Sequence, residues 1–145
     1  MKFQVINEEA PLLVNALVEG VRQHLHDQIG DEATQPLTVV AHDDNGELIG
    51  GVSGRSIYGN FLIEVVWVDK RYRGTGLGRK LMASAEVQAI GRGCKVSQVD
   101  TLSIQAPLFY QKLGFKIVGE IPEFPGSPGR YFLMKTLIEK KNLLG

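Results

Sequence analysis

The chain has 145 residues, of which 43% are hydrophobic and 22% charged, and this composition is typical of one soluble globular domain. Its 16 lysine and arginine residues balance 16 aspartate and glutamate residues, so net charge gives no reason to expect nucleic acid or an anionic membrane as a partner. The single cysteine, Cys94, excludes an intramolecular disulfide and fits a reducing compartment. There is no signal-peptide pattern and no apolar run of ~20 residues. We therefore expect one cytoplasmic domain spanning residues 1–145.

The first half of the chain predicts a short strand, a helix and three further strands. Phe3 to Ile6 is a short apolar start that predicts a strand, and Asn7 is the expected cap of the helix that follows. Apolar residues spaced by four between Pro11 and Gln28 predict an amphipathic helix. The nearly continuous apolar run at Phe61–Val68 predicts a central strand covered on both faces. The strands expected before it are residues 37–41 and 48–56, joined by a turn at residues 43–46.

The second half alternates strands and helices. A glycine-rich loop at residues 73–78 is followed by a predicted helix that ends near Gly91. The remaining expected elements are a strand at 96–102, a helix at 105–113, a strand at 115–118, a loop at 122–129 and a strand at 131–137. Hairpin strands followed by strand–helix–strand–helix–strand predict an α/β or α+β domain with a mixed sheet.

The loop at residues 73–78 carries the clearest chemical signal. It reads Arg-Gly-Thr-Gly-Leu-Gly between a strand and a helix. Glycines let backbone N–H groups approach a ligand, and the start of a helix directs further N–H groups and its dipole at the same place. Arg71, Arg73 and Arg79 add positive charge around this loop. The pattern predicts a cradle for phosphate oxygens.

Other glycine-rich phosphate sites fit this loop less well. The dinucleotide pattern G-x-G-x-x-G fails because Arg79 stands where the third glycine belongs, although Asp100 lies about where a ribose-binding acid is expected. The P-loop pattern fails because no Gly-Lys-Ser or Gly-Lys-Thr triplet occurs. A glycine-rich helix start without any ligand is the remaining alternative.

A second motif, Phe109-Tyr110 followed by Gly114-Phe115, lies downstream. Arg73-x-x-Gly76-x-Gly78 after an apolar strand, followed by a helix, a strand and Phe-Tyr-x-x-x-Gly-Phe, resembles the GNAT superfamily of N-acetyltransferases. Further segments are similar to one subgroup of small bacterial GNAT proteins with unassigned substrate: Trp67-Val68-Asp69, Gly93-Cys94, Asp100-Thr101, Gln105-Ala106-Pro107 and Arg130-Tyr131-Phe132-Leu133 with Lys135. The resemblance implies a mixed, mostly antiparallel sheet of six or seven strands with helices on both faces, and acetyl-CoA as acyl donor.

The resemblance also implies a donor site. Backbone groups of Leu77, Gly78 and Arg79 would bind the pyrophosphate of coenzyme A, and Arg73, Gly74, Thr75 and Gly76 would form the turn before them. In the family this strand splays from the next one, and the pantetheine arm lies in the gap. That gap maps to Val66, Trp67 and Val68, whose main-chain groups would pair with the amides of the arm. Many members have asparagine where this chain has Ser103, so Ser103 is a weaker candidate for a coenzyme contact.

Two residues are candidates for proton transfer. Tyr110 matches the family tyrosine that donates a proton to the departing thiolate; a packing tyrosine on a short helix is the alternative. Glu64 is the only charged residue between Phe61 and Val68, and period 2 places it on one face with Val66 and Val68. It is either the base that accepts the proton of the amine or the partner of an arginine in a structural ion pair.

The acceptor is expected to be a primary amine of a small molecule or a peptide. Its specificity would lie in the first helix and in the segments 30–36, 58–60 and 122–129. No residue cluster has metal-ligand spacing. Two rival functions are a non-catalytic acyl-CoA-binding sensor and a nucleotide-dependent oxidoreductase. The final strand, Tyr131 to Leu137, is a candidate for pairing with a second copy in a homodimer.

Overall fold

The computed structural model describes residues 1–30, 32–105 and 107–138. The chain divides into two compact units, Met1–Ala33 and Thr34–Gly145. Among its described residues, the first unit contains the helix α1 (Pro11–Ile29). The prediction of a single domain over residues 1–145 stays a prediction.

The start of the first unit differs from expectation. Residues 1–10 form neither helix nor strand, so the strand predicted at Phe3–Ile6 is wrong. A strand needs a neighbour for its backbone hydrogen bonds, and no described residue pairs with this segment. The helix predicted between Pro11 and Gln28 is confirmed, and it begins at Pro11, whose fixed φ suits the first helical position. Ala10 occupies the N-cap position, so Asn7 is not the cap.

The second unit is built on a six-stranded sheet with the order β1-β2-β3-β4-β6-β5. Neighbouring strands are antiparallel except β3 and β4, which are parallel. The mixed, mostly antiparallel sheet is thereby confirmed. The strands are β1 (Gln35–His42), β2 (Leu48–Ile57), β3 (Asn60–Val68), β4 (Val96–Leu102), β5 (Lys116–Ile121) and β6 (Arg130–Thr136).

The final strand lies inside the sheet. β6 pairs with β4 along one edge and with β5 along the other. Both rows of its backbone hydrogen-bonding groups are therefore occupied, and the prediction that this strand pairs with a second copy is wrong. The edges of the sheet are β1 and β5.

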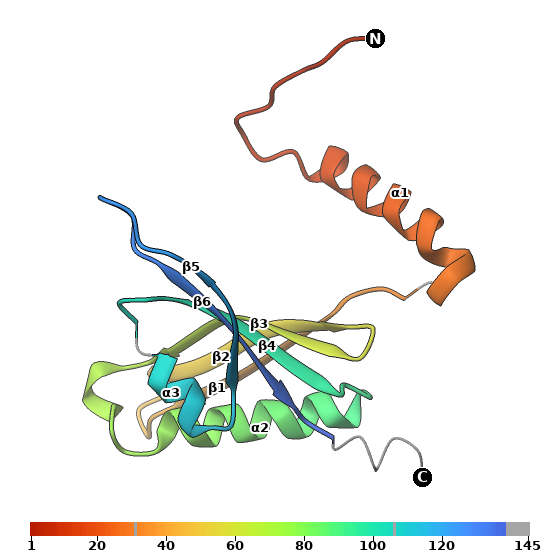
Figure 1. The fold of residues 1–145 in the computed structure, drawn as a ribbon. Helices are drawn as coiled ribbons and strands as arrows, with labels where there is room; N and C mark the ends of the chain where they lie inside the picture. The colour runs from red at the N-terminus through yellow and green to blue at the C-terminus, as the bar shows by residue number, and fades with distance from the viewer. Residues whose placement is uncertain (31, 106, 139–145) are drawn as a thin grey trace. The chain divides into compact units, whose positions relative to one another are not determined.

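One long helix covers one face of the sheet. α2 (Leu77–Gly91) packs against β1, β2 and β3 and runs beneath these strands in Figure 1. Its buried side chains meet Phe61 and Leu133 in the core, where Cys94 is also buried. The described residues of this unit also form two short helices, the 3₁₀ helix η1 (Lys70–Tyr72) and α3 (Pro107–Lys112).

A β-bulge in β3 reverses the faces of the strand. Gly54 of β2 pairs with Ile63 and Ser53 pairs with Val65, so Glu64 is the extra residue. Before the bulge, Phe61 and Ile63 are buried. After it, Val66 and Val68 pack against the core, whereas Val65 and Trp67 are 58% and 43% exposed. The expectation of a strand covered on both faces is therefore wrong.

The bulge requires glycine at position 54. A Cβ at Gly54 would lie 2.2 Å from the carbonyl oxygen of Leu62 and 3.0 Å from the Cα of Ile63. Because both neighbours are backbone atoms, we expect Gly54→Ala to lower the free energy of unfolding by at least ~2 kcal/mol. Urea denaturation measures this change. Gly91→Ala is the matched control, since no atom lies within 4 Å of a Cβ at Gly91. Equal stability of the two variants would contradict the prediction.

The two parallel strands separate beyond their first residues. β3 and β4 pair only at Asn60 with Val96, Phe61 with Ser97 and Leu62 with Gln98. β4 remains paired with β6 as far as Leu102. From Ile63 onward, β3 therefore has no backbone partner on the β4 side among the described residues, and a gap opens towards the glycine loop.

Candidate active site

A cleft of about 1040 Å³ opens where β3 and β4 separate. It extends from the end of β3 across the glycine loop to α3. It is lined by Val66, Trp67, Val68, Tyr72, Arg73, Gly74, Gly76, Gly78, Arg79, Thr101, Gln105, Phe109, Tyr110, Lys112 and Leu113. The structure thus brings most of the predicted donor-site residues to one place, together with Tyr110.

The start of α2 supplies free backbone donors to this cleft. Gly76 is the N-cap residue and has a left-handed backbone with φ 88°, which favours glycine. The N–H of Lys80 bonds the carbonyl of Gly76. The three N–H groups before it, of Leu77, Gly78 and Arg79, have no acceptor within the helix. Three donors at the positive end of a helix suit phosphate oxygens.

Gly78 also sets the distance between α2 and α3. A Cβ at Gly78 would lie 3.0 Å from two ring atoms of Phe109 and 3.5 Å from Val68. Gly78 is buried, so these neighbours surround it. The glycine therefore allows Phe109 to pack directly against the start of α2 and closes this wall of the cleft.

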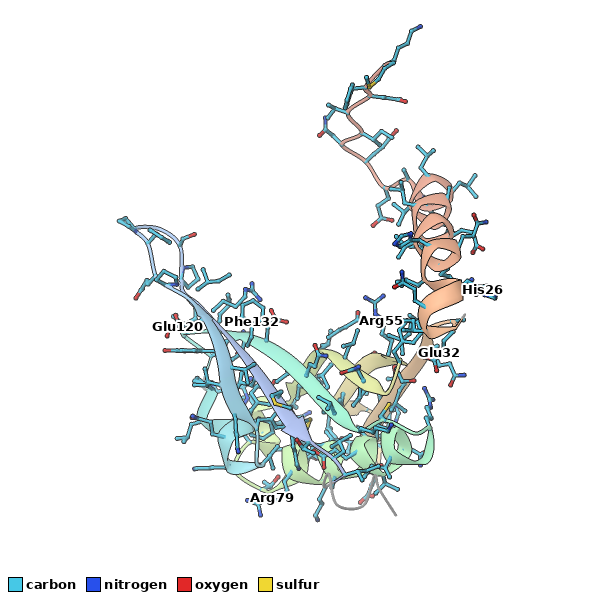
Figure 2. The ribbon with its side chains drawn as sticks, turned by 45° about the vertical axis from the view of Figure 1, so that its right-hand side comes forward. His26, Glu32, Arg55, Arg79, Glu120 and Phe132 are labelled. Atoms are coloured by element: carbon cyan, nitrogen blue, oxygen red, sulfur yellow. The ribbon has the colours of Figure 1, made fainter. Side chains whose placement is uncertain are left out.

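Three cations line the cleft. Arg73 donates from Nε to the carbonyl oxygen of Val68 at 3.2 Å, which ties the loop to the end of β3. Arg79 is exposed and projects outward from α2 (Figure 2). The third, Lys112 in the last turn of α3, was missed by sequence reasoning. These charges fit a ligand that carries several phosphates.

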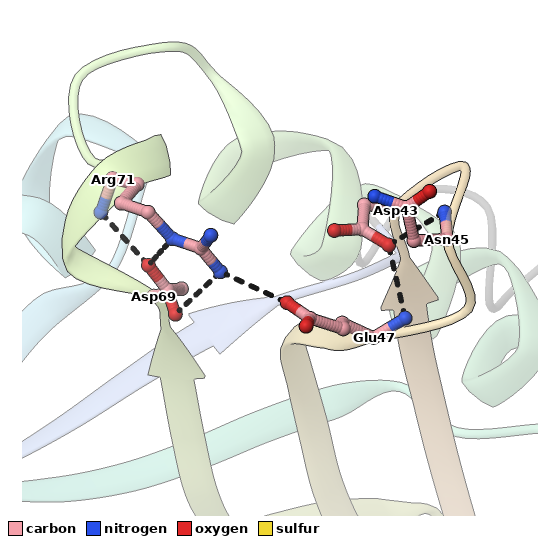
Figure 3. Close-up of polar contacts among 5 residues, drawn as sticks. All are labelled: Asp43, Asn45, Glu47, Asp69 and Arg71. Carbon is pink, nitrogen blue, oxygen red and sulfur yellow. Dashed lines mark hydrogen bonds and ion pairs between the residues drawn. The ribbon is translucent and has the colours of Figure 1, made fainter.

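Arg71 does not join this set. Its side chain hydrogen-bonds Asp69 at 3.0 Å and lies 3.6 Å from Glu47 of the turn before β2 (Figure 3). The hydrogen bond from Arg71 holds the pKa of the Asp69 carboxyl below its usual value. In the same turn, Asp43 accepts the N–H groups of Asn45 and Glu47. The prediction that Arg71 adds charge to the cradle is wrong, because its charge links the β3–α2 loop to the β1–β2 turn.

Tyr110 lies in the cleft among apolar rings. Its ring makes edge contacts with Phe109 and Phe115 at centroid distances of 5.1 and 5.8 Å. Burial raises the pKa of Tyr110 above its usual value of 10, and the negative charge of Asp100 raises it further. The hydroxyl therefore keeps its proton at neutral and moderately alkaline pH, as a proton donor requires.

Some residues that the sequence suggested for a site do not line the cleft. Glu64 lies 3.5 Å from the Nε of Arg55, and both side chains are more than half exposed, at 56% and 53%. Because of the bulge, Glu64 does not share a face with Val66 and Val68, which corrects the period-2 inference. Asp100, on which the dinucleotide alternative depended, pairs with Arg130.

Ser103 and Thr75 also have roles within the fold. The backbone N–H of Ser103 donates to the carbonyl of Gly129 at 2.8 Å. The hydroxyl of Thr75 donates to the carbonyl of Tyr72, which stabilises the glycine loop. Thr101 and Gln105 line the cleft and were missed as site residues. The signal for Thr101 was the alternation along β4, which puts it on the same face as Ser97 and Val99.

The described part of the chain contains no group of three or more His, Cys, Asp or Glu side chains that could hold a metal ion. None of the helices within residues 1–30, 32–105 and 107–138 is long and apolar enough to cross a membrane.

Comparisons with known proteins agree with this geometry. The acetyltransferase (GNAT) domain family matches residues 35–117. Blasticidin-S acetyltransferase of Streptomyces morookaense is 39% identical over 107 residues, covering 71% of this chain and 79% of the relative.

Two solved structures are also similar. An acetyltransferase of Bacillus cereus has a TM-score of 0.79 and 26% identity, covering 92% of this chain and 97% of the other. A protein of Bacillus anthracis, described as a streptothricin acetyltransferase in complex with acetyl coenzyme A, has a TM-score of 0.62 and 24% identity over 70% of this chain and 62% of the other. These two structures show the same fold. The family match over residues 35–117 and the 39%-identical relative show that the chain belongs to the GNAT family and is an N-acetyltransferase whose donor is acetyl-CoA.

Proposed function

We propose that the chain transfers the acetyl group of acetyl-CoA to a primary amine of a small molecule, by direct attack in a ternary complex. The observation that supports this proposal is that the half-buried Tyr110 lines the same cleft as the phosphate cradle. A binding module without catalysis has no need for a proton donor at this position.

The donor would lie along the cleft. Its pyrophosphate would accept the N–H groups of Leu77, Gly78 and Arg79, with Arg73 and Lys112 nearby. Its arm would follow the unpaired edge of β3 at Val66–Val68. Backbone groups alternate between the two edges of a strand, and those of Trp67 face β2. Because the carbonyl of Val68 already accepts a hydrogen bond from Arg73, Val66 would supply the remaining main-chain contacts.

The chemistry then needs two proton transfers. The amine nitrogen bonds the thioester carbon, the C–S bond breaks, and Tyr110 donates its proton to the departing sulfur. The nitrogen must also lose a proton. Glu64 as the base for that step stays a prediction, and its ion pair with Arg55 supports the structural alternative.

The first experiment on the acceptor uses blasticidin S, the compound in the name of the similar enzyme. Blasticidin-S acetyltransferase of Streptomyces morookaense is 39% identical to this chain, so we propose an antibiotic-like amine as acceptor class. We expect blasticidin S, streptothricin or another small amine of a panel to release free coenzyme A thiol in a time-dependent assay. Thermal shift provides the control, because acetyl-CoA and coenzyme A should raise the midpoint and NAD and NADP should not. Binding of acetyl-CoA without turnover on any amine would favour the sensor alternative.

A further inference from the structure

A part-buried ion pair outside the cleft joins α2 to β6. The Nζ of Lys135 donates to both carboxylate oxygens of Glu86, at 2.9 and 3.0 Å. The side chains of Lys135 and Glu86 are only 25% and 16% exposed, and neither residue lines the cleft. The desolvation of such a pair offsets most of its attraction, so the pair adds little net stability. It does fix the distance between the two elements that carry it.

The side chain of Lys135 also lies against the turn that ends α3. Gly114 in this turn has φ 98°, and a Cβ there would lie 3.4 Å from Cε and 3.8 Å from Cδ of Lys135. The ammonium group lies 5.9 Å from the centre of the Phe115 ring, within reach of a cation–π contact. Lys135 therefore connects two consecutive residues of the turn to Glu86 of α2.

The same turn holds Tyr110. The carbonyl of Tyr110 accepts the N–H groups of Leu113 and Phe115, each at 3.0 Å. The ring of Phe115 is 3% exposed and makes an edge contact with the ring of Tyr110. Phe115 thus contacts Tyr110 through both its backbone and its ring, so a displacement of the turn would also move the phenol hydroxyl.

α3 needs this support because it is short. Its six residues meet the start of α2 through the ring of Phe109, which packs against Gly78. One contact leaves a short helix free to tilt about it. The turn held by Lys135 is a second contact, at the opposite end of α3, and two contacts together fix the orientation of the helix.

We propose that Glu86 and Lys135 are positioning residues, which hold the hydroxyl of Tyr110 at a fixed distance from the donor at the start of α2. The ion pair links the helix that would bind the pyrophosphate to the turn that orients the proton donor. This inference rests on the proposed function, because it needs Tyr110 to donate a proton to the departing sulfur.

The test is a double-mutant cycle between Lys135→Met and Tyr110→Phe, measured by the single-turnover release of thiol. Methionine keeps most of the length of the side chain and removes the charge. We expect Lys135→Met to lower the rate about tenfold, since a displacement of ~1 Å can cost up to 10²-fold. Acetyl-CoA affinity, measured by calorimetry, should stay unchanged. In the Tyr110→Phe background, Lys135→Met should have almost no effect, because no hydroxyl is left to position.

Further variants keep the test decisive if Lys135→Met folds poorly. Glu86→Gln keeps the size of the side chain and an oxygen that accepts from Lys135, and it should give a smaller loss of rate that also disappears in Tyr110→Phe. Lys135→Arg keeps the charge and should retain most of the rate. Lys116→Met is the matched control, because Lys116 is exposed and directly follows Phe115. Its rate should equal that of the wild type.

The outcomes separate this inference from the proposed function. If Tyr110→Phe lowers the rate and folded Lys135→Met does not, the positioning role is wrong and the proposed function stands. Equal losses from Lys135→Met with and without the Tyr110 hydroxyl also overturn the role, as does weaker acetyl-CoA binding, because both indicate general damage to the site. If Tyr110→Phe keeps the wild-type rate, the inference falls together with the proton-donor role. If the wild-type chain acetylates no amine, it falls together with the proposed function.

Discussion

Replacing Tyr110 with phenylalanine is expected to lower the single-turnover rate of acetyl transfer by roughly 10²-fold or more, the scale of a positioned acid. Acetyl-CoA binding should remain nearly intact. The phenylalanine ring keeps the edge contacts with Phe109 and Phe115, so only the hydroxyl is lost. A loss of rate without a loss of binding is the sign of an interaction made mainly in the transition state. Stopped-flow detection of thiol release, beside calorimetry, measures both quantities.

The matched control is Tyr131→Phe. Tyr131 also packs against the core but does not line the cleft, so this change should leave the rate unaffected. The pH profile adds an independent readout. Because the pKa of Tyr110 is raised above 10, ionisation of the hydroxyl should not reduce the wild-type rate below that pH. Wild-type rates in Tyr110→Phe would rule out the general-acid role and leave water as the proton source.

The second large effect is expected from Gly78→Val, which should weaken acetyl-CoA binding by tenfold or more and lower the thermal midpoint. A side chain here meets the ring of Phe109, whose atoms lie 3.0 Å from the position of the Cβ. The ring and α3 must move, and both line the cleft. The loss therefore arises from altered packing of the cleft wall as well as from contact with the pyrophosphate.

A second variant separates packing from ligand contact. Phe109→Leu in the Gly78→Val background removes part of the ring that the valine meets, so it should recover thermal stability if packing is the cause. Gly91→Val is the control, because no atom lies within 4 Å of a Cβ there. At Gly76 the space is open but φ is 88°, so valine there would cost backbone strain instead. Wild-type affinity in folded Gly78→Val protein would argue against the cradle.

Local patterns in the sequence predicted most of the helices and strands, and the family resemblance named most of the residues that line the cleft. The four-residue spacing of apolar side chains predicted α1, and the Asp-Asp-Asn-Gly turn predicted the β1–β2 hairpin. The glycine loop predicted the start of α2, and the Phe-Tyr motif predicted a helix that carries Tyr110. These elements can be predicted from the sequence because helix hydrogen bonds, turns and caps join residues that are close in the chain.

Strand register, strand order and long-range side-chain contacts could be determined only from the tertiary structure. The bulge at Glu64 depends on the register of β3 against β2, and it reverses the face on which that carboxylate lies. The pairing of Arg71 with Glu47 and the internal position of β6 join residues far apart in the chain. Thr101 became a site residue only because β3 and β4 separate beside it. Strand order and register depend on long-range contacts, and a period-2 pattern shifts by one residue wherever a bulge occurs.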